Sequence, residues 1–190
     1  MFKQIAERLI PSKRHFVRKI RLHYGPILEI EGCQTITFFM SPRLEWEGSL
    51  NHEVLGLAGP RLDDFIVNKI ERPQSGTAHC LPSFDMTDRQ GLFMAVLSEW
   101  DGGIDFDDAD LVRCYRNTID LAQQLGFTSI AFPAMGKDKR DFPHIRFARL
   151  AIQGILERLD GRMNEVYIAC ADKRMYDTYK DRLLKMGWKA

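Results

Sequence analysis

Residues 111–148 constrain the fold of this chain more than any other stretch. Apolar residues recur at helical spacing up to Leu125, and Gly126 follows in the position where helices commonly end. The short apolar run 128–132 predicts a buried strand, which the next residue, a proline, ends because it donates no hydrogen bond to a sheet. A second helix is expected to begin near Pro143. The loop between this strand and helix should lie at the carboxyl edge of an open α/β sheet, where such sheets bind ligands.

Four aspartates precede the first of these helices: Asp105, Asp107, Asp108 and Asp110. Negative charge is favourable at a helix N-terminus, where unpaired backbone N–H groups carry a partial positive charge. The alternative, an acidic metal loop, requires a spacing of acids and glycine that is absent here. We therefore expect the aspartates to mark the start of the helix, and we predict no metal site.

The rest of the chain also contains strand and helix patterns. Strands are expected at residues 15–24, 34–40, 77–82, 92–98 and 165–171. Helices are expected at residues 2–10, 49–70 and 173–186, the second of them bent or divided at Gly59–Pro60. The alternation of about five helices with six strands favours the α/β class. The length of 190 residues suits a single domain, with residues 1–14 as a helical lead-in and 15–190 as the core.

Charge and hydropathy exclude several classes of function. The net charge is +1, so there is no overall field to attract nucleic acid or a membrane. Apolar runs fall far short of the ~20 residues of a membrane span. Glu7 and Arg8 interrupt the apolar pattern that a signal peptide would need. The basic run at residues 13–21 could form a nucleic-acid patch, but a solvated strand face is the commoner case.

The four cysteines favour a reducing compartment. Cys33, Cys80, Cys114 and Cys170 form no C-x-x-C pair and fit no zinc spacing. The last three lie within apolar strand or helix patterns, so we expect buried, reduced thiols. We therefore predict a cytoplasmic protein with no cofactor.

Several short motifs match one known family in order and spacing. In the second half they are Cys114–Thr118 (CYRNT), Ser129–Ala134 (SIAFPA) and Phe142–Pro143; in the first half they are Gly25–Ile27, Leu57–Pro60, Gly76–Ala78 and Leu81–Pro82. Together they resemble the macro domain over roughly residues 16–186. The resemblance implies a three-layer α/β/α sandwich with a mixed six-stranded sheet. It also implies binding of ADP-ribose, whose derivatives some members of the family hydrolyse.

The ligand positions of the first half depart from the family. Pro26 stands where the resemblance places an aspartate that accepts from adenine, and Ser41 where it places an asparagine near the distal ribose. The glycine-rich loop is replaced by residues 45–49 (EWEGS), whose bulk and negative charge disfavour a close phosphate. Asn51 replaces the aspartate that activates water in hydrolytic members, and an amide cannot act as a general base. Leu55 replaces a frequent histidine, so we predict that hydrolysis is absent.

The second ligand loop departs in the same way. In residues 136–141 (GKDKRD), both glycines of the family pattern are aspartates and three cations are added. Lys137, Lys139 and Arg140 could pair with a phosphate. They could also pair with the acidic residues of the two loops and fill the cleft, which is the commoner behaviour of loop charges.

These observations predict a macro-domain-like module that binds a phosphate-bearing nucleotide or an ADP-ribose-like ligand without hydrolysing it. The ligand should lie between loops 41–51 and 134–142, because both loops follow strand ends. The predicted ligand-binding residues are Ser41, Gly48, Ser49, Leu50, Asn51, Pro133, Ala134, Met135, Gly136, Lys137, Arg140 and Phe142. Two alternatives stay open. One is a protein-interaction or structural module with a closed cleft; the other is a divergent ADP-ribosyl hydrolase that uses titratable groups such as His52, Glu53 or Asp138.

Overall fold

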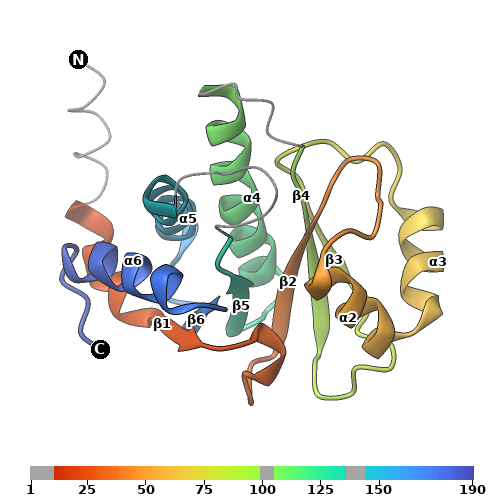
Figure 1. Cartoon of the computed structure of the whole chain (residues 1–190), viewed down its shortest axis with the longest axis horizontal. Helices are drawn as coiled ribbons and strands as arrows, with labels where there is room; N and C mark the ends of the chain where they lie inside the picture. The colour runs from red at the N-terminus through yellow and green to blue at the C-terminus, as the bar shows by residue number, and fades with distance from the viewer. Residues whose placement is uncertain (1–10, 99–104, 136–143) are drawn as a thin grey trace.

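A six-stranded sheet with the strand order β1-β6-β5-β2-β4-β3 runs through the centre of the protein (Figure 1). The computed structural model describes residues 11–98, 105–135 and 144–190. The strands are β1 (Ile20–Tyr24), β2 (Thr35–Met40), β3 (Ala78–Leu81), β4 (Gly91–Val96), β5 (Ser129–Pro133) and β6 (Glu165–Cys170). Neighbouring strands pair in parallel except β3, which runs antiparallel to β4 at one edge. The predicted mixed six-stranded sheet is confirmed.

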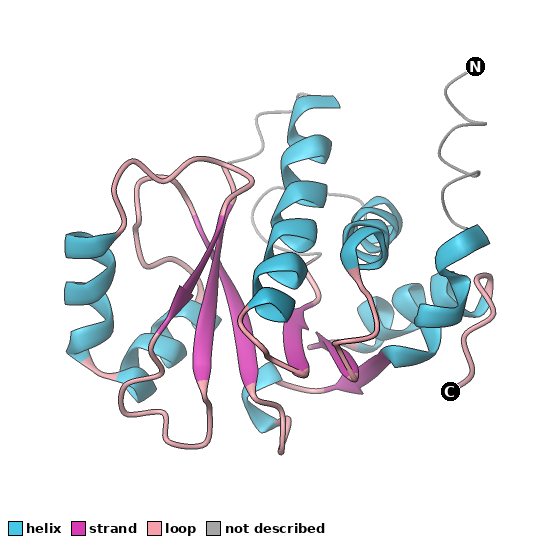
Figure 2. Ribbon diagram, turned by 180° about the vertical axis from the view of Figure 1, so that it is seen from behind, coloured by secondary structure: helices cyan, strands magenta, loops and turns pink. Residues whose placement is uncertain are grey.

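Helices cover both faces of this sheet (Figure 2). On one face lie α4 (Asp105–Gln124), α5 (His144–Arg158) and α6 (Lys173–Leu184), and on the other α2 (Ser49–Ala58) and α3 (Pro60–Lys69). Two short 3-10 helices, η1 (Pro11–Lys19) and η2 (Ile27–Glu29), flank β1. The predicted three-layer α/β/α sandwich is confirmed. The predicted division at Gly59–Pro60 is also confirmed, because Gly59 separates α2 from α3.

Side chains of the central strands alternate between the two helical layers. In β2, Ile36, Phe38 and Met40 pack in the layer of α2 and α3. Phe39 points to the other side, where its ring lies 5.6 Å from that of Tyr115 in α4. Burial on both faces explains why β2 and β4 have nearly continuous apolar sequences.

The predicted strand at residues 15–24 is only partly correct, because η1 occupies its first half and β1 alone pairs with β6. The cause is a set of contacts with the end of α5. Lys13 Nζ donates to the Leu159 carbonyl (3.0 Å) and Lys19 Nζ to the Asp160 carbonyl (3.2 Å). Carbonyl groups at a helix C-terminus lack partners within the helix and attract cations. Two members of the basic run therefore stabilise the end of α5.

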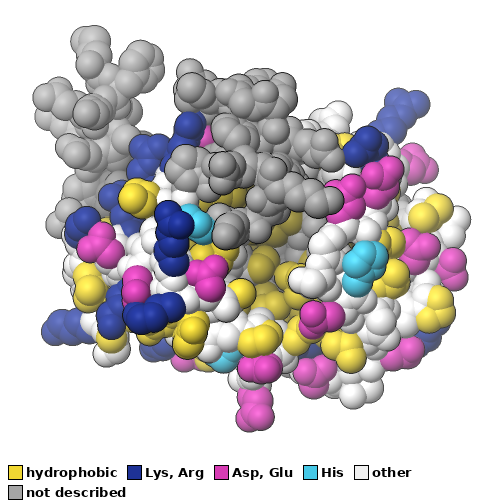
Figure 3. All heavy atoms as spheres, viewed as in Figure 1, with side chains coloured by type: hydrophobic (Ala, Val, Ile, Leu, Met, Phe, Trp, Pro, Cys, Tyr) yellow, Lys and Arg dark blue, Asp and Glu magenta, His cyan; other side chains and the backbone are white. Residues whose placement is uncertain are grey.

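Although the net charge is near zero, positive and negative side chains are unevenly distributed along the chain. Residues 11–24 contain five Lys or Arg and no Asp or Glu, whereas residues 41–58 contain three Glu and one Arg. On the face in Figure 3, many Lys and Arg side chains lie on the side of α5 and α6, and Asp and Glu are frequent on the side of α2 and α3. The first ligand loop therefore belongs to the more acidic part of the molecule.

The apolar stripe of α4 ends one turn earlier than predicted. Leu111, Tyr115 and Ala122 are buried, but Leu125 is 54% exposed. The helix ends at Gln124, so Leu125 lies beyond its last turn, where Gly126 with a φ of 84° redirects the chain. The predicted helix at residues 2–10 lies outside the described residues.

The aspartates before Leu111 belong to the start of α4, as predicted. Asp108 accepts a hydrogen bond from Arg146 Nε (3.0 Å), and Asp110 forms an ion pair with Arg113. Within residues 11–98, 105–135 and 144–190, no three His, Cys, Asp or Glu side chains gather as they would around a metal ion. No helix in these ranges has the length and apolar character needed to cross a membrane.

Gly154 allows α5 to lie close against α4. A Cβ atom at this position would lie 2.7 Å from the Val112 carbonyl oxygen and 2.8 Å from Tyr115 Cβ. Gly56, which is exposed in α2, would meet no atom within 4 Å if it carried a Cβ. Both glycines therefore lie within α-helices, but a side chain would be crowded at Gly154 and free of contacts at Gly56.

We expect Gly154→Ala to lower the free energy of unfolding by about 1–3 kcal/mol, because the added methyl group separates α4 from α5. Gly56→Ala is the matched control. It should raise the same free energy by up to about 1 kcal/mol, because alanine is the better helix former at an open position. Urea unfolding followed by circular dichroism measures both changes. Similar effects of the two substitutions would contradict the close packing of α4 on α5.

Candidate ligand-binding site

The carboxyl ends of β2 and β5 lie at the same edge of the sheet. The two strands pair in parallel, with Thr35 opposite Ile130. β2 ends at Met40 and β5 at Pro133, so the loops that follow them leave the sheet from neighbouring strands. The predicted adjacency of these strand ends is confirmed. In open α/β sheets, the space between such loops is the usual ligand position.

Loop 41–48 connects β2 to α2. It turns at once, because the Leu44 N–H donates to the Ser41 carbonyl (2.9 Å) and Leu44 adopts a left-handed φ of 57°. Gly48, with a φ of 84°, precedes the helix, and a Cβ on it would meet no atom within 4 Å. Ser49 and Leu50 then form the start of α2. The first N–H groups of α2, which lack partners within the helix, therefore follow an uncrowded glycine.

Asn51 has a structural contact in this loop region. It is 6% exposed, and its Nδ2 donates to the Phe39 carbonyl at 2.8 Å. This bond holds the first turn of α2 against the end of β2. Leu50 and Leu55, on the same helix, pack against the core layer of α2 and α3. The side chain that stands in place of a general base therefore donates to the main chain.

Trp46 lies on the α3 side of β2. Its ring stacks on that of Phe38, with centroids 5.8 Å apart and planes inclined by 19°. Its Nε1 donates to Asp63 Oδ1 at 2.7 Å. The neighbouring Glu45 pairs with Arg43 of the same loop (3.4 Å). The bulky residue of the loop is thus held between the sheet and α3.

The second loop begins directly above the core. The Ala134 N–H donates to the Ala169 carbonyl of β6 at 2.7 Å, and Ala134 is 8% exposed. Pro133 and Met135 are half-buried, and Met135 packs against the core layer of α4, α5 and α6. The four remaining predicted residues of this loop, Gly136, Lys137, Arg140 and Phe142, lie outside the described residues.

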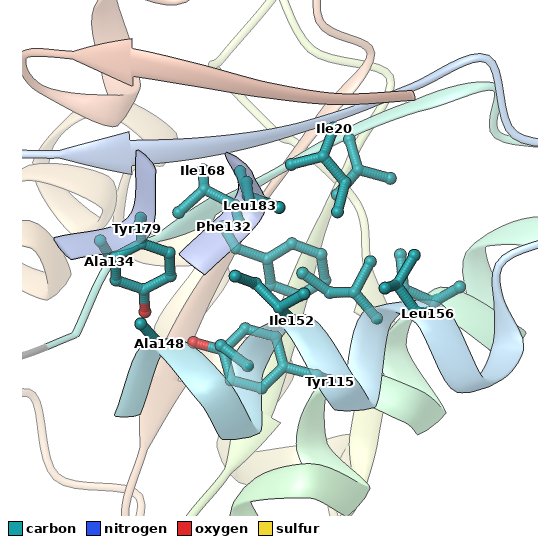
Figure 4. Packing of buried hydrophobic residues seen from close by; sticks show 14 of the residues in the cluster. Ile20, Tyr115, Phe132, Ala134, Ala148, Ile152, Leu156, Ile168, Tyr179 and Leu183 are labelled. Atoms are coloured by element: carbon teal, nitrogen blue, oxygen red, sulfur yellow. The ribbon is translucent and has the colours of Figure 1, made fainter. Parts of the chain in front are cut away.

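The floor beneath Ala134 is an uncharged core (Figure 4). The side chains of Tyr115 and Tyr179 come from α4 and α6, and their hydroxyl groups face each other near Ala148. Burial raises the pKa of both tyrosines well above its usual value. Burial likewise raises the pKa of the Cys114 and Cys170 thiols to about 12, so these thiols stay protonated at neutral pH.

All four cysteines are free thiols, as predicted, and three are buried, whereas Cys80 is half-buried. Burial raises the pKa of Cys33 and of Cys80. A thiol is a weak nucleophile when it is protonated. The thiols therefore behave as packing groups.

An aromatic pair at the same edge of the sheet was missed from the sequence. Tyr24, the last residue of β1, is 62% exposed, and its ring packs edge-on against that of Tyr176 in α6 (5.8 Å between centroids). Lys180 Nζ lies 6.0 Å from the centroid of the Tyr176 ring. The two tyrosines are far apart in sequence, so no local pattern links them. The position of Tyr24 at the end of a strand, next to Gly25–Pro26, was the available signal.

The fold is an α/β/α sandwich in which the loops after two neighbouring parallel strands leave the sheet at the same edge. The macro domain family model matches residues 41–151, more than half of the chain, so the chain belongs to the macro domain family. The resemblance to the macro domain that the sequence indicated is thereby confirmed.

Relatives and solved structures agree with this assignment. The chain is 28% identical over 174 residues to the O-acetyl-ADP-ribose deacetylase of Cronobacter turicensis. The matched region covers 87% of this chain and 96% of that protein. The chain superposes on the Oceanobacillus iheyensis macrodomain with ADP at a TM-score of 0.75 (20% identity, 90% and 93% coverage). It also superposes on the Trypanosoma brucei macrodomain in complex with ADP-ribose at a TM-score of 0.74 (22% identity, 87% and 69% coverage). The structural matches support the fold.

We expect Asn51→Asp to lower the free energy of unfolding at neutral pH by about 1–3 kcal/mol, because a buried carboxylate would face the Phe39 carbonyl without a donor. Asn68→Asp is the matched control, since Asn68 Nδ2 donates to the Asp64 carbonyl (2.7 Å) on the exposed surface of α3. That substitution should change the free energy by less than about 0.5 kcal/mol. Thermal and urea unfolding measure both. Equal losses would show that Asn51 has no special structural contact.

Proposed function

We propose that this macro domain binds ADP-ribose, or a closely related phosphate-bearing nucleotide, between loops 41–51 and 134–142 and does not hydrolyse it. The observation that carries the proposal is the adjacency of the β2 and β5 carboxyl ends, from which both loops arise. Membership of the family supports the ligand class, as do neighbours of the same fold solved with ADP and with ADP-ribose.

The start of α2 suits a phosphate group. Backbone N–H groups of the first helical turn are unpaired and carry partial positive charge, which favours an anion. Gly48 leaves space beside them, because nothing would contact a Cβ there within 4 Å. Ser41 Oγ, at the other end of the loop, is buried and has no hydrogen-bond partner within the described chain. A ligand hydroxyl would satisfy this atom, which favours a sugar-bearing ligand.

The exposed ring of Tyr24, which packs on the partly buried Tyr176, supports a ligand with a flat ring. Tyr24 ends β1 at the edge of the sheet from which the loops arise, and Tyr176 lies near the start of α6, which follows β6. Exposed aromatic rings stack on nucleobases of any type, typically with a stabilisation of about 1–3 kcal/mol per base. We therefore propose that the base lies on the β1 side and the phosphates on the α2 side of the site.

The absence of hydrolysis is supported by the chemistry of Asn51. An amide cannot take a proton from water, and its Nδ2 already donates to the Phe39 carbonyl. The thiols of the core have raised pKa values and stay protonated. Neither group can activate a water molecule in this geometry.

A divergent hydrolase is the second candidate, because the Cronobacter turicensis relative over 87% of the chain is named O-acetyl-ADP-ribose deacetylase. Incubation of the protein with O-acetyl-ADP-ribose, followed by chromatography of the products, separates the two candidates. The hydrolase would be established by turnover above the uncatalysed rate, provided that Asn51→Ala or a substitution at Ser41 abolishes this turnover. Binding without turnover is the result we expect.

A module with a closed cleft is the third candidate. Trp46, the bulkiest side chain of the first loop, is held between Phe38 and Asp63. Glu45 pairs with Arg43 of its own loop. These contacts support an open crevice, and the failure of every nucleotide to bind would favour the closed one.

ADP-ribose binding, measured by isothermal titration calorimetry, should depend on the cations of the second loop. Replacing Lys137 and Arg140 together with alanine should weaken it by about 1–3 kcal/mol, because charge-assisted bonds to phosphate are lost. The affinity of the natural protein should also fall as salt is added, since pairs at a solvent-exposed rim are screened.

The matched control replaces Arg158 and Arg162 with alanine, which removes the same charge. Both residues are exposed; Arg158 ends α5 and Arg162 lies between α5 and β6, so they lie at the opposite edge of the sheet. We expect the control to bind almost normally. If both double variants bind ADP-ribose equally well, the ligand lies elsewhere.

A further inference from the structure

We propose that the contact between Trp46 and Asp63 fixes loop 41–48 in the shape that the ligand requires. Both residues would then position the binding site without touching the ligand. This inference rests on the proposed function, because it assigns a role in the affinity of the same crevice.

The Trp46 side chain joins the loop to two different elements. Its ring stacks on Phe38, which is completely buried in β2. Its Nε1 donates to Asp63 Oδ1 in the first turn of α3, at 2.7 Å. An N–H group that donates to a carboxylate makes a stronger bond than one that donates to a neutral acceptor. The contact therefore fixes the indole ring in both position and orientation.

The rest of the loop is fixed near its ends. The turn from Ser41 to Leu44 holds the beginning, and the bond from Asn51 to Phe39 holds the helix that follows. Within the described chain, residues 45–47 make no backbone hydrogen bond outside helices and strands. Glu45 and Glu47, on either side of Trp46, are exposed. Trp46 is therefore the side chain that holds the middle of the loop.

A loop that is already ordered binds its ligand more tightly than one that must become ordered. Fixing the backbone of each free residue costs conformational entropy, and this cost is subtracted from the affinity. The indole packs against the core layer on the α3 side of β2, so it holds the middle of the loop against that layer. Loss of the contact should release residues 44–48 and weaken binding.

A simpler role for Asp63 is to provide negative charge at the start of α3. Asp64, the next residue along α3, has the same charge and an exposed side chain. Its carboxylate makes no hydrogen bond or ion pair within the described chain. Asp64→Ala therefore removes an equal charge from the helix and leaves the indole contact in place.

The test compares Asp63→Ala, Asp64→Ala and Asp63→Asn with the unaltered protein. Asparagine keeps an oxygen that can accept from the indole, so Asp63→Asn should preserve the contact. Hydrogen exchange of the amides of residues 44–48 reports the order of the loop. Calorimetric titration with ADP-ribose reports the affinity, and urea unfolding reports the global stability.

In Asp63→Ala, we expect the amide hydrogens of the loop to exchange with solvent about tenfold faster or more, because a charge-assisted hydrogen bond is lost. ADP-ribose should bind about three- to tenfold more weakly to this variant. Asp64→Ala and Asp63→Asn should remain within about twofold of the unaltered protein in both measurements, since neither breaks the indole contact.

Loop exchange that is the same in Asp63→Ala and Asp64→Ala would overturn the proposal. Faster exchange with an unchanged affinity would also overturn the role in binding. If the unaltered protein binds no ADP-ribose, the proposed function fails and the role in affinity fails with it. In that case the exchange data still show whether Trp46 and Asp63 fix the loop.

Discussion

The parallel pairing of β2 with β5 is the constraint on which the rest of the site depends. Thr35 lies opposite Ile130, and both strands run in the same direction. Parallel neighbours must end at the same edge of a sheet, so the loops after Met40 and Pro133 emerge side by side. The two helical layers hold the pairing by burying both faces of these strands. The neighbouring starts of the two loops are therefore a consequence of the sheet order.

The scaffold of the macro domain is kept here, while its ligand loops are changed. Where the family pattern has glycines, this chain has the sequence from Glu45 to Ser49, and the loop is shaped by Trp46. Asn51 stands where the family pattern has an aspartate, and its side chain donates a hydrogen bond that holds α2 to β2. The first replacement is held by a contact with α3, and the second leaves an amide that cannot act as a general base.

Local patterns were sufficient to predict most of the strands, the division at Gly59 and the carboxyl ends of β2 and β5, because burial and turn residues leave a periodic signal. Contacts between distant segments left no such signal. Residues 15–19 were predicted as strand but form part of η1, where Lys19 donates to the carbonyl of Asp160, about 140 residues away in sequence. The pairing of Tyr24 with Tyr176 and the bond from Trp46 to α3 depend in the same way on the assembled fold.

The central claim is that a nucleotide binds at the shared carboxyl edge of β2 and β5. Amide NMR spectra recorded during titration with ADP-ribose test this claim most directly, because each amide reports its own surroundings. We predict that the largest shifts occur at Ser49–Asn51, at Ala134–Met135 and at Tyr24, while η1 and the C-terminal end of α5 stay unchanged. Shifts confined to η1, or an unchanged spectrum at millimolar ADP-ribose, would contradict the account.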